Sequence, residues 1–224
     1  MNVLIFGATG MVGQGVLREC LAADEIETVH VVGRTPVAQR QAKLHQQILP
    51  DLFELGSLKD QFVGVDACFF CLGVSSTGMS EEAYTRITYD LTLHAATMLA
   101  QQNPQMVFIY VSGSGTDSTE RGSVMWARVK GKTENHLMRL PFAAVGLFRP
   151  GTIIPMNGEQ SKTRSYRLFY TIFTPLLKML HSLAPNSILT TEDMGRAMLS
   201  FANQRTGRQI LTTRDIVRLA RQSG

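Results

Sequence analysis

Residues 3–13 read VLIFGATGMVG, an apolar run that breaks into glycines at positions 7, 10 and 13. The run predicts a buried strand, and the pattern that follows it predicts a helix. Glycine permits a tight turn, a close approach of phosphates to the backbone, and close packing of the helix on the strand. The phosphates would face the positive end of the helix dipole. We therefore predict a dinucleotide site, in preference to a purely structural glycine turn, with contacts from Gly7, Thr9, Gly10, Met11, Val12 and Gly13.

Composition limits the class of protein. The chain has 224 residues, of which 44% are hydrophobic, and this fits one α/β domain with an ample core. The net charge is only +4 and Lys and Arg are scattered, so we expect no nucleic-acid partner. Residues 168–177 are apolar but too short to span a bilayer, and Pro175 interrupts them, so no transmembrane segment is expected. Met1 leads directly into the first strand without signal-peptide features, which favours a cytoplasmic location.

The three cysteines include a Cys-x-x-Cys pair, Cys68 and Cys71, a spacing known from redox and metal sites. Both lie in an apolar run, where residues three apart point to opposite faces of a strand. Buried, inert thiols are therefore the favoured interpretation. The five histidines are dispersed without metal-ligand spacing, so we expect no metal site.

Strands and helices alternate along the chain, which predicts a single doubly wound parallel sheet of α/β class. Right-handed crossovers give the strand order 3-2-1-4-5-6. The expected strands are residues 3–6, 28–32, about 47–49, 65–72, 106–111 and 143–148, with a further short strand at 209–211. The expected helices are residues 11–22, 80–102, about 122–139, 163–182, 191–203 and 213–221.

The pattern changes after Pro150. We expect residues 1–224 to form one domain, with about 151–224 as a small, mainly helical extension on the substrate side. The segment 163–182 is expected to be helical, and its sequence is both apolar and basic. It is open whether it forms a lid, a substrate-side helix or a subunit contact, the last of which would make the protein a homodimer.

The end of the second predicted strand decides which dinucleotide fits. An enzyme that prefers NAD usually has Asp or Glu there, which accepts hydrogen bonds from the ribose 2′-hydroxyl. This chain has Gly33 and Arg34, which leave room for a 2′-phosphate and offer it a planar set of charged donors. Arg40 and Lys43 are expected to add positive potential. The sequence therefore favours NADP over NAD, although an exposed arginine is also an ordinary surface residue.

Two more segments end predicted strands at the same edge of the sheet. Leu72, Gly73 and Val74 follow the fourth strand, where glycine lets the backbone approach the ribose and nicotinamide. Asp51 follows the third strand and has two equal interpretations, an adenine contact or an exposed turn residue.

An ordered set of motifs now points to a family: Gly7-Ala8-Thr9-Gly10-x-x-Gly13, Gly33-Arg34, Cys71-Leu72-Gly73, Ser112, Val129-Lys130-Gly131 and Phe148-Arg149-Pro150-Gly151. Nearly the whole chain resembles the atypical short-chain dehydrogenase/reductases. The Tat-interactive-protein-like oxidoreductases are most similar, and the NmrA-like NADP-binding proteins are more distant. The resemblance implies a single Rossmann domain, bound NADP(H) with Pro150 among its contacts, and a substrate crevice covered by the C-terminal third.

The family's usual chemistry joins a Ser after strand five to a Tyr-x-x-x-Lys motif on the next helix. Tyr transfers a proton, Lys binds the ribose and lowers the tyrosine pKa, and Ser orients the substrate oxygen. In this chain Lys130 is present, but Trp126 stands where tyrosine is expected. An indole N–H cannot act as an acid near neutral pH. Trp126 either stacks on a substrate or fills core.

Ser112 and Lys130 are the remaining catalytic candidates. Ser112 or Ser114 could orient a carbonyl, but hydroxyls in such Gly/Ser-rich loops commonly only stabilise turns. Lys130 either holds the ribose or is a solvated charge on a helix. Tyr84, Tyr89 and Tyr110 are further proton sources, although Tyr110 lies in a predicted strand and is expected in the core.

Two functions follow from this pattern. The first is an NADPH-dependent oxidoreductase of the atypical type that acts on an unknown small substrate. The second is a regulatory protein that binds NADP(H) without turnover and contacts a partner. The missing tyrosine favours the second function, and the retained Lys130 favours the first, towards which the sequence leans.

Overall fold

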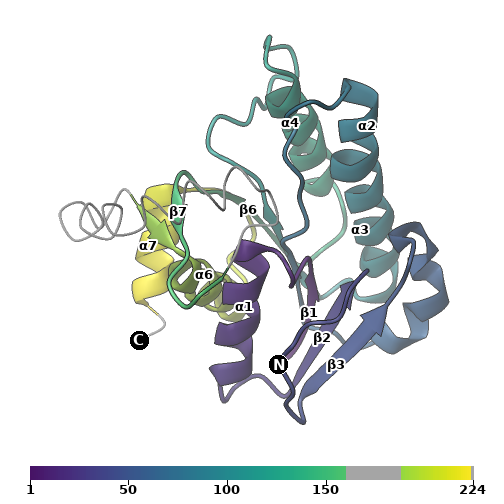
Figure 1. Ribbon diagram of the computed structural model, residues 1–224, viewed down its shortest axis with the longest axis vertical. Helices are drawn as coiled ribbons and strands as arrows, with labels where there is room; N and C mark the ends of the chain where they lie inside the picture. The colour runs from purple at the N-terminus through teal and green to yellow at the C-terminus, as the bar shows by residue number, and fades with distance from the viewer. Residues whose placement is uncertain (160–187, 223–224) are drawn as a thin grey trace.

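The computed structural model describes residues 1–159 and 188–222, and one parallel sheet of seven strands forms its centre (Figure 1). The order is β3-β2-β1-β4-β5-β6-β9, which confirms the predicted 3-2-1-4-5-6 arrangement and adds a strand beside β6. The strands are β1 (Asn2–Phe6), β2 (Thr28–Gly33), β3 (Leu44–Ile48), β4 (Ala67–Phe70), β5 (Val107–Val111), β6 (Ala144–Arg149) and β9 (Arg208–Thr212).

Helices cover both faces of this sheet (Figure 1). One face is covered by α1 (Met11–Ala22), α6 (Thr191–Gln204) and α7 (Thr213–Arg221). The other is covered by the 3-10 helix η1 (Leu52–Phe62), α3 (Leu91–Gln102) and α4 (Met125–Leu137), and α2 (Glu81–Thr85) packs on α4. This is the doubly wound α/β arrangement that the sequence predicts.

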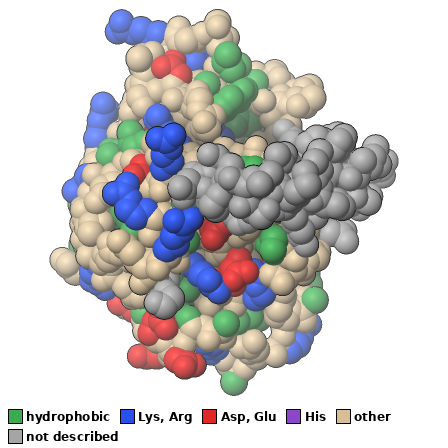
Figure 2. Space-filling model, turned by 90° about the vertical axis from the view of Figure 1, so that its left-hand side faces the viewer, with side chains coloured by type: hydrophobic (Ala, Val, Ile, Leu, Met, Phe, Trp, Pro, Cys, Tyr) green, Lys and Arg blue, Asp and Glu red, His purple; other side chains and the backbone are tan. Residues whose placement is uncertain are grey.

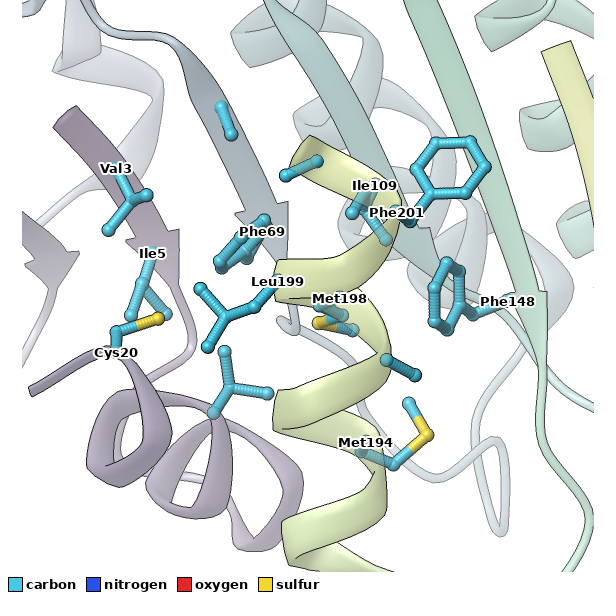
Figure 3. Packing of buried hydrophobic residues seen from close by; sticks show 14 of the residues in the cluster. Val3, Ile5, Cys20, Phe69, Ile109, Phe148, Met194, Met198, Leu199 and Phe201 are labelled. Atoms are coloured by element: carbon cyan, nitrogen blue, oxygen red, sulfur yellow. The ribbon is translucent and has the colours of Figure 1, made fainter. Parts of the chain in front are cut away.

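Strand residues alternate between two apolar clusters because successive side chains point to opposite faces. Val3 and Ile5 of β1 face α1 and α6, whereas Leu4 and Phe6 face α3. Figure 3 shows the first cluster, in which side chains of α6 lie against those of the central strands. Its labelled members are Val3, Ile5, Cys20, Phe69, Ile109, Phe148, Met194, Met198, Leu199 and Phe201.

Two glycines let α1 and α6 approach closely. A Cβ on Gly15 would lie 2.6 Å from the Thr191 carbonyl oxygen, and a Cβ on Gly195 would lie 2.5 Å from Cγ of Glu19. Arg196 of α6 also forms a salt bridge to Glu19 of α1, with 3.4 Å between Nε and Oε2. Figure 2 shows one face of the molecule, on which Lys and Arg side chains lie next to Asp and Glu side chains. The late helix α6 is thereby fixed against the first helix of the chain.

The structure corrects several predicted elements. The helix expected over 80–102 is interrupted by a π-helical turn, η2 (Arg86–Asp90), and the strand expected over 65–72 covers only β4. The third strand begins earlier than expected, and α4 is shorter than predicted. The short strands β7 (Ile153–Ile154) and β8 (Leu189–Thr190) pair with each other, which the sequence did not indicate, and η1 was also missed. The predicted helix 163–182 lies outside the described residues.

Candidate functional site

The turn between β1 and α1 depends on its glycines. Gly7 has a φ of +78°, and a Cβ there would lie 2.7 Å from the Leu72 nitrogen. A Cβ on Gly13 would lie 2.2 Å from the Gly7 carbonyl oxygen, so only glycine lets α1 begin this close to the strand. Gly10 differs from both, because the one neighbour of its Cβ position is the Gly7 oxygen at 3.3 Å. Gly7 and Gly13 therefore exclude any side chain, whereas a Cβ on Gly10 would make a single tight contact.

The N-terminus of α1 has no capping side chain among the described residues. Gly10 is the N-cap, no side chain accepts a hydrogen bond there, and the first turn, which begins with Met11 and Val12, contains no acidic residue. The Gly10 N–H donates to the Gly7 carbonyl at 2.9 Å, and the side-chain amide Nε2 of Gln14 donates to the Thr9 carbonyl at 3.0 Å. The first backbone N–H groups of a helix need an acceptor and attract anions. This turn can therefore receive phosphate.

The exposed Arg34 follows the end of β2, where the fold places the ribose of a dinucleotide. Within residues 1–159 and 188–222, its guanidinium forms no hydrogen bond or ion pair. Arg40 instead donates to the Val37 and Gln39 carbonyls at 2.9 and 3.0 Å. The expectation that Lys43 adds potential at the site is wrong, because its ammonium binds the Ala23 carbonyl at 2.8 Å, beyond the C-terminal end of α1.

The segment after β4 borders the glycine turn. Leu72 lies against Gly7, while Gly73 and Val74 are exposed and Gly73 has no atom within 4 Å of its Cβ position. Asp51 caps η1, since its carboxylate accepts a hydrogen bond from the Phe53 N–H at 2.9 Å. The turn interpretation of Asp51 thus has an observed contact, and its adenine contact stays a prediction.

Ser112 lies at the end of β5 and is buried. Its Oγ is 3.0 Å from Oγ1 of Thr116, and the Thr116 hydroxyl donates to the Gly113 carbonyl at 2.8 Å. Because a hydroxyl has one proton, Ser112 must be the donor in the first contact. The Ser112 proton is therefore already used within the loop.

Lys130 of α4 reaches the same end of β5. Its Nζ donates to the Tyr110 hydroxyl at 3.4 Å and to the Val111 carbonyl at 3.3 Å, and it lies 5.1 Å from the centre of the Tyr110 ring. Burial lowers the pKa of Lys130 to about 8, and the nearby Glu134 carboxylate opposes this shift. This environment differs from that of the solvated helix lysine considered as an alternative.

Trp126 lies one helical turn before Lys130 and borders the loop after β5. A Cβ on Gly115 would lie 3.5 Å from Cη2 of the indole, and one on Gly113 would lie 3.9 Å from Cζ3. Tyr110 is buried in the core, as predicted, and Tyr84 of α2 is also buried. Tyr89 packs between Lys132 and His136, with Lys132 Nζ 4.3 Å from its ring centre.

The loop between β5 and α4 is held by contacts that sequence reasoning missed. Arg149, at the end of β6, forms an ion pair with the buried Glu134 of α4 and donates to Ser118 Oγ at 2.6 Å. A Cβ on Gly131 would lie 1.8 Å from the Asp117 carbonyl oxygen, so glycine lets the loop close on α4. Arg149 belongs to the Phe-Arg-Pro-Gly motif, but nothing in the sequence identified Glu134 as the partner of its guanidinium.

Pro150 completes this edge of the sheet. It is buried, and its carbonyl accepts a hydrogen bond from the Ser114 N–H at 2.8 Å, which joins the end of β6 to the loop after β5. Parallel strands end at one edge, so the glycine turn, Leu72, Ser112 and Pro150 gather at the carboxyl edge of the sheet.

Cys20 and Cys68 are buried, as predicted, whereas Cys71 is half-buried. Cys68 belongs to the cluster that faces α3, and Cys71 packs on the opposite cluster beside α1. All three thiols are free, and burial raises the pKa of Cys71 to about 12. Among the described residues, no three His, Cys, Asp or Glu side chains gather as a metal site would require. In the same part of the chain, no helix has the length and apolar character needed to span a membrane.

Residues 3–120 match the NAD dependent epimerase/dehydratase family. The chain belongs to this family. The matched residues include the glycine turn, the ends of β2 and β4, and the first part of the loop after β5. The chain is thus a Rossmann domain of an NAD(P)-dependent family, as the fold and the site indicate.

Relatives support the resemblance seen in the sequence. Protein HTATIP2 of Rattus norvegicus is 28% identical over 156 residues, which are 68% of this chain and 63% of that protein. The mitochondrial protein fmp52 of Emericella nidulans is 28% identical over 188 residues, or 81% of this chain and 78% of that protein. The chain therefore spans less than two thirds of the rat protein's length. These relatives confirm the resemblance to the atypical short-chain dehydrogenase/reductases.

Solved structures share the fold. MoeE5 in complex with UDP-glucose and NAD has a TM-score of 0.70 and 16% identity, and the match covers 95% of this chain and 75% of MoeE5. The ADP-L-glycero-D-manno-heptose-6-epimerase of Helicobacter pylori has a TM-score of 0.67 and 16% identity, with 100% of this chain and 82% of that enzyme covered. At such identities the likeness shows the fold alone.

One expectation from the sequence is contradicted. The start of the chain favoured a cytoplasmic location, but several similar proteins from different fungi are named as mitochondrial. The cytoplasmic assignment is therefore withdrawn. The absence of a recognisable signal peptide is a weak guide, because targeting segments differ widely in sequence.

Proposed function

We propose that this chain binds NADP(H) at the turn between β1 and α1 and acts as an oxidoreductase on a small substrate. The observation that carries the proposal is the N-terminus of α1, where Gly10 is the N-cap and no described side chain caps the helix. Backbone N–H groups at such a turn suit a pyrophosphate. Gly7, Thr9, Gly10, Met11, Val12 and Gly13 would surround it, and Leu72, Gly73, Val74 and Pro150 would border the ribose and nicotinamide.

The choice of NADP over NAD is supported by Arg34. Its guanidinium is exposed beyond β2 and makes no contact within the described residues that would hold it elsewhere. A guanidinium offers two parallel donors to a phosphate, and Gly33 beside it leaves room for that group. No acidic residue of the NAD type stands at this position. Asp51 is retained as a proposed adenine contact at the end of β3.

A bound NADPH would supply hydride, and the chain's own residues would hold the cofactor and manage the proton. Lys130 lies where its ammonium could bind the ribose, and Ser112 lies at the same end of β5. Because the Ser112 proton is directed to Thr116, Ser112 is suited to accept a hydrogen bond from a ligand. We include residues 151–224 in the same domain, as its substrate side, because α6 and α7 share the core of the central sheet.

Calorimetry of the purified protein with NADPH, NADP⁺, NADH and NAD⁺ tests the cofactor. We expect the phosphorylated forms to bind more tightly, and equal affinities would contradict the preference. The absorbance of bound NADPH is then followed with a panel of aldehydes, ketones and other small electrophiles. Oxidation of NADPH by any acceptor, above the rate without protein, supports the oxidoreductase.

A second function is favoured by Trp126, which occupies the position of the usual proton donor. A protein that binds NADP(H) and never oxidises it would sense the cofactor and signal to a partner. Tight NADPH binding without decay over the whole acceptor panel would support this sensor and contradict the oxidoreductase.

A further inference from the structure

We propose that Lys130 is the catalytic acid of this site and that Tyr110 positions its ammonium group. This inference rests on the proposed oxidoreductase function and assigns the proton that the usual tyrosine would give. It begins from the position of Lys130 Nζ, 3.3 Å from the last carbonyl of β5 and 3.4 Å from the Tyr110 hydroxyl. Lys130 thus reaches the strand end that borders Ser112.

Two neighbouring side chains fail as proton donors. Trp126 has an indole N–H, which does not release a proton near neutral pH. Ser112 gives its only proton to Thr116, because the Thr116 hydroxyl donates to the Gly113 carbonyl. A proton taken from Ser112 would have to break this arrangement, and a neutral hydroxyl is also a poor acid.

The buried tyrosines fail for another reason. Tyr84 is 2% exposed and Tyr110 is 1% exposed, so neither can touch a substrate at the edge of the sheet. Burial raises the pKa of both phenols, which opposes the loss of a proton. The Tyr110 hydroxyl can instead accept a hydrogen bond from Lys130, and it therefore acts through the lysine.

Lys130 has the proton that the reaction needs. An ammonium carries three N–H donors, and two of them are directed to the Tyr110 hydroxyl and the Val111 carbonyl. Within the described residues the third has no partner, and it would be shared between the ribose and a substrate oxygen. A bound NADPH would supply hydride to the carbonyl carbon and leave as NADP⁺, and Lys130 Nζ would give its proton to the carbonyl oxygen. Lys130 becomes a neutral amine and recovers a proton from water.

The electrostatic surroundings suit this role. Burial lowers the pKa of Lys130 to about 8, which is near the working pH of most enzymes and is the range in which a general acid is most effective. Glu134, one turn further along α4, favours the charged form, and Arg149 of β6 pairs with Glu134. Tyr84 of α2 interacts with Tyr110. Of these groups, Glu134 limits how far the lysine pKa falls.

The first test uses the protein without cofactor. Isotope-edited NMR follows the lysine side-chain resonances through a pH titration, and Lys130→Arg identifies the resonance of Lys130. We expect Lys130 to titrate well below the other lysines. Tyr110→Phe removes the accepting hydroxyl and should lower the pKa of Lys130 further. Tyr89→Phe is the matched control, since Tyr89 packs on Lys132 and should leave Lys130 unchanged.

The second test separates proton transfer from cofactor binding. With saturating NADPH and an active acceptor, Lys130→Arg should slow reduction at least a hundredfold, since general acids contribute about 10²- to 10⁴-fold. Arginine keeps the positive charge but cannot give up a proton. Tyr110→Phe should move the pH profile of reduction to lower pH, in line with the lower pKa that we expect for Lys130 in the NMR titration.

The outcomes are distinguishable. If the native protein reduces an acceptor and Lys130→Arg matches its rate at saturating NADPH, Lys130 only binds cofactor and this inference is overturned. An ordinary lysine titration for Lys130 in the NMR experiment would overturn it as well. If NADPH binds but no acceptor is reduced by the native protein, the proposed oxidoreductase fails, and the catalytic acid fails with it.

Discussion

The guanidinium of Arg149 and the carboxylate of Glu134 form an ion pair between β6 and α4. Nε of Arg149 lies 3.0 Å from Oε1 of Glu134, and the side chains are 18% and 1% exposed. The same guanidinium donates to Ser118 in the loop after β5. One side chain therefore joins a strand end, a helix and the loop that borders the site, which gives the Phe-Arg-Pro-Gly motif a structural role.

Loss of this pair should destabilise the fold. Arg149→Met leaves the Glu134 carboxylate buried without a partner, and we expect the free energy of unfolding to fall by about 3–5 kcal/mol. Arg205→Met is the control, because Arg205 pairs with Asp66 at 3.6 Å on the surface and should lose at most about 1 kcal/mol. Urea unfolding followed by the fluorescence of the single tryptophan measures both. Similar losses of unfolding free energy in the two variants would contradict a stabilising role for the Arg149–Glu134 pair.

Two glycines of the turn between β1 and α1 should differ in how alanine substitution affects stability. Gly13→Ala places a methyl group against the Gly7 carbonyl, and we expect a destabilisation of about 1–3 kcal/mol from overpacking. Gly10→Ala meets one atom at 3.3 Å, so it should fold normally yet bind NADPH more weakly. Urea unfolding and calorimetry on the same preparations separate the two effects. A Gly10→Ala variant that unfolds as easily as Gly13→Ala would refute the distinction.

Sequence patterns predicted the central fold because local signals agreed with it. The glycine turn and apolar spacing gave α1 its observed bounds of Met11–Ala22, and buried apolar runs located the inner strands. The signals failed where the chain lacks regular spacing. The 3-10 helix Leu52–Phe62 has no strong periodicity, and the pairing of Ile153–Ile154 with Leu189–Thr190 joins segments far apart in sequence.

The sequence predicted which strand ends border the candidate site, but it did not predict the hydrogen bonds and ion pairs between the residues there. Ser112 and Lys130 were found from their motif, but the proton of Ser112 could not be assigned before the Thr116 contact was seen. Glu134 is a carboxylate on a helix, and such residues are normally solvated. Only the distant Arg149 explains its burial. The expectation for Lys43 was wrong because its ammonium lies at the C-terminal end of α1, where it binds the Ala23 carbonyl.

The thiols should be unreactive in the folded protein. Burial raises the pKa of Cys20, Cys68 and Cys71, and a thiol reagent attacks the thiolate. We expect the native protein to react with a chromogenic disulfide reagent at least tenfold more slowly than a free thiol, and the urea-unfolded protein to release three equivalents. Rapid modification of any native thiol, or a disulfide between Cys68 and Cys71, would show that the pair is redox-active.

The partly buried ammonium of Lys130 should make stability depend on pH. Its folded pKa is lowered, so its charging opposes folding below about pH 8, and this penalty disappears as pH rises towards the unfolded pKa. Lys130→Met removes the penalty. The stability of the variant relative to the native protein should therefore fall by about 1–2 kcal/mol between roughly pH 7 and pH 9.5. Urea unfolding at both pH values measures it, and a constant difference would mean that Lys130 is solvated.

Calorimetry of Arg34→Ala with NADPH and NADH measures whether Arg34 binds the 2′-phosphate of a dinucleotide. We expect NADPH affinity to fall by about 10- to 150-fold, as for a lost charged hydrogen bond, with NADH affinity unchanged. Arg40→Ala is the control, because its guanidinium is held by the Val37 and Gln39 carbonyls. Equal losses of affinity for both cofactors in Arg34→Ala, or unaltered NADPH binding, would show that Arg34 does not bind the 2′-phosphate.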